Sequence, residues 1–222
     1  SFHVESVDTF ILSHGIFVSA ENGVEEAYTK VKQIPLSSSH LGIVAEVNEL
    51  SREIAGGFVS IEEAKERLRK IDQMPAKRSY FQVLAAGMGS ASFGYLLGAT
   101  ALESVITFFI GCILYMWVLT AKKYSISKML VNILGGVLIT VLALLALHLP
   151  FPGLKIDGMI IGSIMPLIPG LALVNAIRDI ADSDFLSGTV RMIDALLVFV
   201  YIAVGVGFTL SVYNKIGGGL IL

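Results

Sequence analysis

Residues 156–180, IDGMIIGSIMPLIPGLALVNAIRDI, contain a run of 20 residues without a charged side chain, from 158 to 177. An α-helix rises about 1.5 Å per residue, so about 20 apolar residues suffice to cross the hydrocarbon core of a bilayer. Four more uncharged runs follow or precede this one, at 79–102, 104–121, 129–154 and 195–214. None alternates polar and apolar residues as the strands of a membrane β-barrel do. We therefore expect an α-helical polytopic membrane protein with five transmembrane helices, at about 80–99, 103–121, 129–149, 157–179 and 192–213.

The remaining charge is concentrated at the start of the chain. Of the 34 charged residues among 222, 21 lie in residues 1–79 and only 13 in residues 80–222. The second part has too few polar groups to cover its own surface in water, whereas the first part has enough. The sequence therefore predicts a small α+β N-terminal domain over 1–76, followed by a five-helix transmembrane domain over 77–222.

The distribution of lysine and arginine predicts the orientation of the helices. With five crossings, the loops on one side carry 11 lysines and arginines near the membrane, and the loops on the other side carry only Lys155 and Lys215. Cytoplasmic loops are enriched in these residues. Residues 1–20 contain Glu5 and Asp8 and lack the continuous apolar core of a signal peptide. We expect a multi-pass protein of the cell membrane (inner or plasma membrane), with a cytoplasmic N-terminus and an outside C-terminus.

Two amphipathic helices and two short strands are predicted in the N-terminal domain. In residues 41–55 the apolar side chains fall on one helical face, and Gly56-Gly57 end this helix. Ser60 and Glu63 form the pattern of a capping box at the start of a second helix. Residues 15–19 and 28–34 are predicted strands, with Glu21-Asn22-Gly23 as the turn between them.

The fourth apolar run is interrupted at its centre. Pro166, Pro169 and Gly170 fall within five residues. Proline lacks an N–H group and clashes with the preceding helical turn, and glycine tolerates non-helical dihedrals. One interpretation is a simple proline kink whose freed carbonyl groups are satisfied by neighbours. The other is a broken helix that exposes backbone groups to a small solute near the midplane of the bilayer, as in many secondary transporters.

A dense polar cluster follows this interruption. Its members within 20 residues are Asn175, Arg178, Asp179, Asp182, Asp184, Ser187, Arg191 and Asp194. A solvated loop with capping acids is one explanation. Alternatively, the balanced charges pair between two helices or bind a solute, because arginine can hold a carboxylate and aspartate an ammonium group or a proton.

Other patterns in the chain do not indicate a cofactor or an enzyme. The sequence has one cysteine, no Walker motif, no recognisable nucleophile–base pair and no cluster with metal-ligand spacing. We expect neither a cofactor nor a metal, no catalytic residues and no nucleic-acid partner. Ala86, Ser90, Gly94 and Gly98 recur every four residues, and such a small-residue stripe allows another helix to approach closely.

The polar cluster and the interruption together resemble the signature of the threonine/serine exporter family. The residues that carry the resemblance are Met165-Pro166, Pro169-Gly170, Asn175, Arg178-Asp179, Asp184, Ser187-Gly188, Arg191 and Ala195. The segment 41–68 and the layout of a cytoplasmic region followed by five spans are also similar to that family. Two features depart from the pattern, since Asp182 stands where the family usually has a small residue and the N-terminal region is short.

The resemblance implies a subunit or half of a secondary exporter. In the family, two membrane halves are joined in one chain or split between two proteins, and this chain resembles the larger half. The implied solute is a threonine/serine-like amino acid or a short dicarboxylate. The implied partners are a second small membrane protein of the same family, a second copy of the chain, or both. The candidate solute- or ion-binding residues are Pro166, Pro169, Gly170, Asn175, Arg178, Asp179, Asp184, Ser187, Gly188, Arg191 and Asp194.

Three hypotheses for the function remain. The first is export driven by the proton gradient, because no nucleotide-binding motif is present, with Asp179 as the candidate coupling group. The second is a non-transporting anchor or regulatory subunit of a membrane complex. The third is an intramembrane aspartyl hydrolase using Asp179 and Asp194, which arginines close to both acids disfavour.

Overall fold

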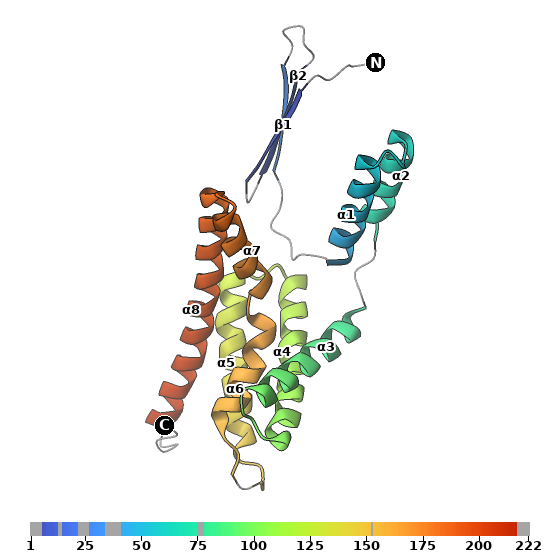
Figure 1. Cartoon of the computed structure of the whole chain (residues 1–222). Coiled ribbons are helices and arrows are strands. Elements are labelled where there is room, and N and C mark those ends of the chain that lie inside the picture. Colours follow the sequence, from blue (N-terminus) through green and yellow to red (C-terminus); the bar gives the residue numbers. More distant parts are fainter. Residues whose placement is uncertain are drawn as a thin grey trace. The chain divides into compact units, whose positions relative to one another are not determined.

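The computed structural model describes residues 6–12, 15–21, 27–33, 41–74, 78–151 and 153–216. The chain divides into two compact units, Ser1–Lys77 and Arg78–Leu222. The first unit contains strands and two helices, and the second is built from helices alone among its described residues (Figure 1).

The first unit begins with a three-stranded antiparallel sheet in the order β1-β2-β3, formed by β1 (Ser6–Leu12), β2 (Gly15–Glu21) and β3 (Ala27–Gln33). The last two strands agree with the predicted segments, whereas β1 was not predicted. The signal that could have found β1 is its content of β-branched residues, such as Val7 and Thr9. Of the predicted turn 21–23, Glu21 ends β2, and the other two residues lie outside the described residues.

A helical hairpin completes this unit. Helix α1 (Leu41–Ala55) ends at the predicted glycine pair, and Gly57 adopts a φ of +72° that glycine tolerates. Helix α2 (Ile61–Asp72) begins at the predicted cap, because the Ser60 hydroxyl accepts a hydrogen bond from the backbone N–H of Glu63 at 3.3 Å. Leu50 of α1 packs against Ala64 and Ile71 of α2 in a small buried core.

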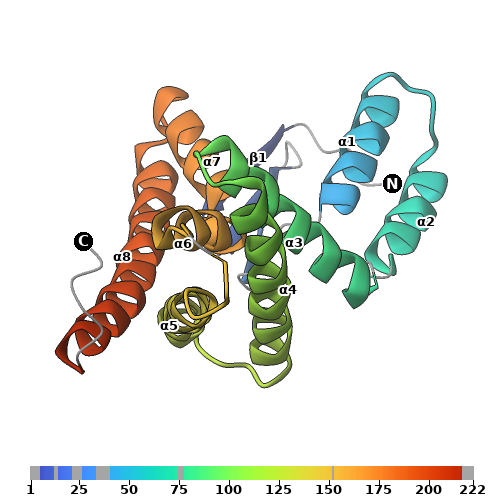
Figure 2. The same ribbon diagram turned by 90° about the horizontal axis from the view of Figure 1, so that it is seen from below.

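The second unit is a bundle of six α-helices and one 3₁₀ turn among the described residues. Its elements are α3 (Ser79–Leu96), α4 (Ala101–Lys123), α5 (Lys128–Ala146), α6 (Ile156–Ile164), η1 (Met165–Leu167), α7 (Gly170–Ala181) and α8 (Phe185–Lys215). Helices α4, α5 and α6 pack side by side, with α3 against α4 and α6 and with α8 against α5 and α7 (Figures 1 and 2). The buried centre is apolar and includes Leu114 of α4, Ile139 of α5 and Met159 of α6.

Small residues set the closest helix contacts. A Cβ atom added at Gly162 of α6 would lie 2.7 Å from Cα of Gly94 in α3. One added at Gly136 of α5 would lie 2.7 Å from the carbonyl oxygen of Ile202 in α8. The predicted small-residue stripe of α3 thus faces α6 of the same chain at Gly94, and such contacts draw the helix backbones together without large side chains.

Three helices are long and apolar enough to cross a membrane: α4, α5 and α8. The segments Ile156–Leu167 and Gly170–Ala181 meet the same criterion together and are bent by 63° at the residues between them. Helix α3 does not meet it, because Gln82, two tyrosines and several glycines and serines among its 18 residues lower the mean hydropathy. The structure therefore supports a membrane protein with three or four candidate spans, and the span expected at about 80–99 stays a prediction.

The observed helix ends differ from the predicted spans in one important place. The fifth span was expected to begin near residue 192, but α8 begins at Phe185. Asp184 precedes it as the N-cap, with its carboxylate accepting a hydrogen bond from the backbone N–H of Ser187 at 3.2 Å. The uncharged run marks only the apolar part of the helix, whereas the cap sets where the helix starts. As a result, Arg191 and Asp194 lie two turns inside α8 rather than at its beginning.

Trp117 and Glu103 each form hydrogen bonds between different segments of this unit. The indole N–H of Trp117 in α4 donates a hydrogen bond to the carbonyl oxygen of Val131 in α5, at 3.1 Å. At the start of α4, the Glu103 carboxylate accepts from the backbone N–H groups of Thr100, at 2.7 Å, and Lys155, at 2.6 Å. Glu103 is only 1 % exposed, so one buried carboxylate both closes the capping box of α4 and holds the N-cap residue of α6.

Candidate functional site

The predicted interruption lies between α6 and α7. Pro166 falls in η1, and Pro169 directly precedes α7, which begins at Gly170. Between them Ile168 has an extended backbone, with φ −66° and ψ 124°, and its N–H donates to the carbonyl oxygen of Met165 at 3.2 Å. The N–H of Gly170 donates to the carbonyl oxygen of Ile168 at 2.9 Å. The chain therefore changes direction through short local hydrogen bonds in place of α-helical ones, because neither proline can donate.

The two helices after the interruption form a tight hairpin. Gly188 of α8 lies so close to α7 that an added Cβ would be 2.9 Å from the backbone nitrogen of Ile180 and 3.0 Å from the carbonyl oxygen of Ala176. Ala176 is completely buried in this contact. The geometry gives Gly188 a packing role, and Ser187 beside it is also buried.

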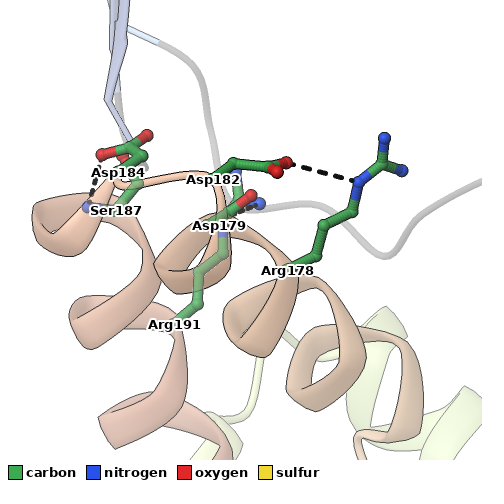
Figure 3. A network of polar contacts seen from close by, with 6 residues as sticks. All are labelled: Arg178, Asp179, Asp182, Asp184, Ser187 and Arg191. Atoms are coloured by element: carbon green, nitrogen blue, oxygen red, sulfur yellow. Dashed lines mark hydrogen bonds and ion pairs between the residues drawn. The ribbon is translucent and has the colours of Figure 1, made fainter.

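Ion pairs join the charged residues of this hairpin. The Arg191 guanidinium of α8 donates to the Asp179 carboxylate of α7, with 2.7 Å between Nη1 and Oδ2 (Figure 3). Arg178 and Asp182, one helical turn apart, are 3.6 Å apart between Nε and Oδ2 (Figure 3). The side chains of Arg178 and Asp182 are mostly exposed, whereas those of Asp179 and Arg191 are 24 % and 37 % exposed. The pair between α7 and α8 is therefore the better shielded one, and screening weakens it less than the exposed pair.

A further ion pair connects the hairpin to α5. The Lys128 ammonium group at the start of α5 donates to the Asp194 carboxylate of α8 at 2.6 Å. Asp179 and Asp194 thus bind different cations on different helices. An aspartyl hydrolase requires two aspartates that share one proton, whereas here each aspartate is paired with its own cation.

The predicted site residues fall into two separate groups. Pro166, Pro169 and Gly170 form the bend. The charged residues lie around the other end of α7, where Asp179 is nine residues beyond Gly170. At 1.5 Å per residue the two groups are about 14 Å apart along the helix. Asn175 lies between them on the exposed surface of α7. A single small solute cannot touch the bend and the Arg191–Asp179 pair at the same time.

Next to the bend the structure contains a pocket that the sequence did not indicate. It has a volume of about 370 Å³ and lies between α3, α4 and η1. Two of its lining side chains are joined, since the Tyr115 hydroxyl of α4 donates to Oε1 of Gln82 in α3 at 3.1 Å. Gln82 is a polar residue within the first uncharged run, which is the signal that could have drawn attention to it. Among the described residues no group of three or more histidine, cysteine or acidic side chains is placed to hold a metal ion.

Comparisons with known proteins place the chain in a family. Neither the curated proteins nor the solved structures contain a significant match. A family model described as "Putative threonine/serine exporter" matches residues 1–213, which is all but the last nine residues. The chain therefore belongs to the threonine/serine exporter family.

Proposed function

We propose that the chain is one half of a secondary exporter that moves a small polar metabolite out of the cell, driven by the proton gradient. Membership of an exporter family implies a transport protein of the membrane rather than an enzyme. The solute is a threonine/serine-like amino acid or a short dicarboxylate. In this proposal α3 also crosses the membrane, as the first of five spans. Residues 1–76 form a cytoplasmic domain, and the C-terminus lies outside.

The observation that carries the proposal is the Arg191–Asp179 ion pair between α7 and α8. It is partly shielded from water and lies one short helix away from a 63° bend. Charged side chains are costly within membrane-spanning segments and are retained there mainly for ion or solute pathways. A carboxylate that exchanges its arginine partner for a proton would couple protonation to the contact between these two helices, and Asp179 is the candidate for that role.

Mutation of either partner tests the proposal. Asp179→Asn and Arg191→Ala should each abolish efflux from cells, while membrane insertion and the amount of folded protein stay unchanged. Asp182→Asn is the matched control, because Asp182 is mostly exposed and belongs only to the weaker pair with Arg178. It should export like the wild type. Wild-type efflux from both Asp179→Asn and Arg191→Ala would refute the role of the pair.

A second membrane component completes the proposed pathway. Five helices rarely enclose a site that opens alternately to both sides, so the missing helices come from a small partner protein of the same family or from a second copy. Efflux should therefore require coexpression of the small partner, or else an oligomer of this chain. Efflux by monomers alone would refute this part of the proposal.

A further inference from the structure

The pocket beside the bend has polar and aromatic side chains in its walls. Its lining includes Gln82, Gly89, Phe93, Tyr115, Met165 and Pro166. None of its lining residues carries a formal charge. At about 370 Å³ it is in the size range of sites for small molecules.

Several groups around this pocket can accept hydrogen bonds or attract a cation. Oε1 of Gln82 is an acceptor, and the hydroxyl oxygen of Tyr115 keeps acceptor capacity while its proton is given to Gln82. Helix α6 ends at Ile164, directly before the lining residues Met165 and Pro166, and the carboxyl end of a helix carries partial negative charge. Phe93 and Tyr115 add aromatic rings to the lining, and the face of an aromatic ring attracts cations.

From these features we propose that this pocket binds the transported solute through a primary ammonium group and rejects dianions. The inference rests on the proposed export function and deepens it, since it locates the solute beside the bend and away from the ion pairs. A dianion entering the pocket would lose the water of two carboxylates without meeting a cation, which is strongly unfavourable, whereas an amino acid brings only one carboxylate. An ammonium group meets acceptors and ring faces that replace its water.

A second pocket of similar size provides an internal comparison. It has a volume of about 400 Å³ and is lined by Ile164, Phe199, Ile202, Ala203, Val206 and Gly207. None of these side chains can form a hydrogen bond, so this pocket offers nothing to a polar solute. Each pocket contains a helical glycine, Gly89 or Gly207, at which an added Cβ would meet no atom within 4 Å. A larger side chain can therefore be placed in either pocket without a clash at its Cβ.

The test compares Gly89→Leu with Gly207→Leu in the purified full-length protein. Equilibrium binding of radiolabelled L-threonine is measured in detergent, with succinate as the dianionic competitor. We expect Gly89→Leu to weaken L-threonine binding more than about tenfold, since the new side chain overfills the site. Gly207→Leu should bind like the wild type, and succinate should not compete. Size-exclusion profiles and melting temperatures establish that both variants are folded.

Tyr115→Phe provides a milder change that keeps the ring and removes the hydroxyl. It should weaken L-threonine binding by about two- to tenfold, the usual effect of one hydrogen bond. Unchanged L-threonine binding in Gly89→Leu would overturn the proposal. It would also be overturned if the wild-type protein preferred succinate, or if it bound neither probe at millimolar concentration. Efflux assays in cells are independent of this test. If Gly89→Leu exports as well as the wild type, the role of the pocket is refuted and the export function stands. If the expected binding is found but the wild type shows no efflux, the export function is refuted and the binding site stands.

Discussion

Glu103 shows how much one side chain can determine in this molecule. Its carboxylate is almost fully buried and accepts hydrogen bonds from two backbone N–H groups that lie 55 residues apart, those of Thr100 and Lys155. The first bond closes the capping box of α4, and the second fixes the residue before α6. A buried N–H group without an acceptor costs about 1–3 kcal/mol, so removal of this carboxylate affects two helices at once.

Replacement of Glu103 should therefore destabilise the membrane unit. We expect Glu103→Ala to lower the free energy of unfolding by about 2–4 kcal/mol, because two backbone donors lose their acceptor. Glu103→Gln keeps one acceptor oxygen in nearly the same shape and should lose about half as much. The melting temperature of the purified protein in detergent, followed by circular dichroism, measures both changes. Equal melting temperatures for Glu103→Ala and the wild type would contradict this role.

The charged residues of the site were predictable, but their partners were not. The cluster from Arg178 to Asp194 is visible in the sequence because charges are otherwise scarce there. The structure pairs Asp194 with Lys128, which lies 66 residues earlier and directly before the predicted span 129–149. Gln82 and Tyr115 are 33 residues apart, and their joint position beside the bend follows from the packing of α3 on α4. Contacts at such separations depend on helix rotations that a single sequence does not determine.

At the scale of elements, the crossing of α5 and α8 depends on two glycines. A Cβ at Gly205 would overlap the carbonyl oxygen of Ile133, and a Cβ at Gly136 would lie 2.7 Å from that of Ile202. In both cases the obstacle is backbone, which cannot move aside as a flexible side chain can. The helices can approach this closely only while both positions lack a side chain.

Alanine at either position should separate these helices. We expect Gly136→Ala and Gly205→Ala each to lower the stability of the purified protein by about 1–3 kcal/mol, the usual cost of an overpacked contact. Gly207→Ala is the matched control in the same helix, since its Cβ would meet nothing within 4 Å. It should be neutral or stabilise by up to about 1 kcal/mol, because alanine favours helix. If all three variants melted alike, the crossing would not depend on these glycines.

The sequence predicted the elements better than their ends and angles. Apolar periodicity and the Ser60 cap gave α1 and α2, and the uncharged runs at 104–121 and 129–154 gave α4 and α5. The start of α8 was wrong by seven residues, because the helix continues past the apolar run to its cap at Asp184. Two prolines predict an interruption, but they do not predict its angle of 63°.

At the scale of the whole molecule, the distribution of charge predicts which loops share a side of the membrane. Eleven lysines and arginines lie near the membrane in one set of loops and two in the other. This distribution predicts that the loop between α4 and α5 is cytoplasmic and that the loop between α5 and α6 faces outside. An odd number of spans is required for the two chain ends to lie on opposite sides, so the topology also tests whether α3 crosses.

Cysteine labelling in intact cells should reveal this topology. The native Cys112 is replaced by serine, and single cysteines are introduced as Tyr124→Cys between α4 and α5 and as Phe151→Cys between α5 and α6. Both parent side chains are exposed. A membrane-impermeant maleimide should label only Phe151→Cys until the cells are permeabilised, and a cysteine at Ser60 should behave like Tyr124→Cys. Labelling of Ser60→Cys in intact cells would place the N-terminal unit outside.

Trp117 is the only tryptophan in the chain, and its indole is fixed at the contact between α4 and α5 by the hydrogen bond to Val131. Light of a wavelength that tyrosine does not absorb therefore excites a single chromophore in the whole protein. The colour and intensity of its emission depend on the polarity around the indole and on this hydrogen bond. The unmodified protein thus carries its own optical probe, and a spectral change on addition of a solute would report, without any attached dye, that the α4–α5 contact has moved.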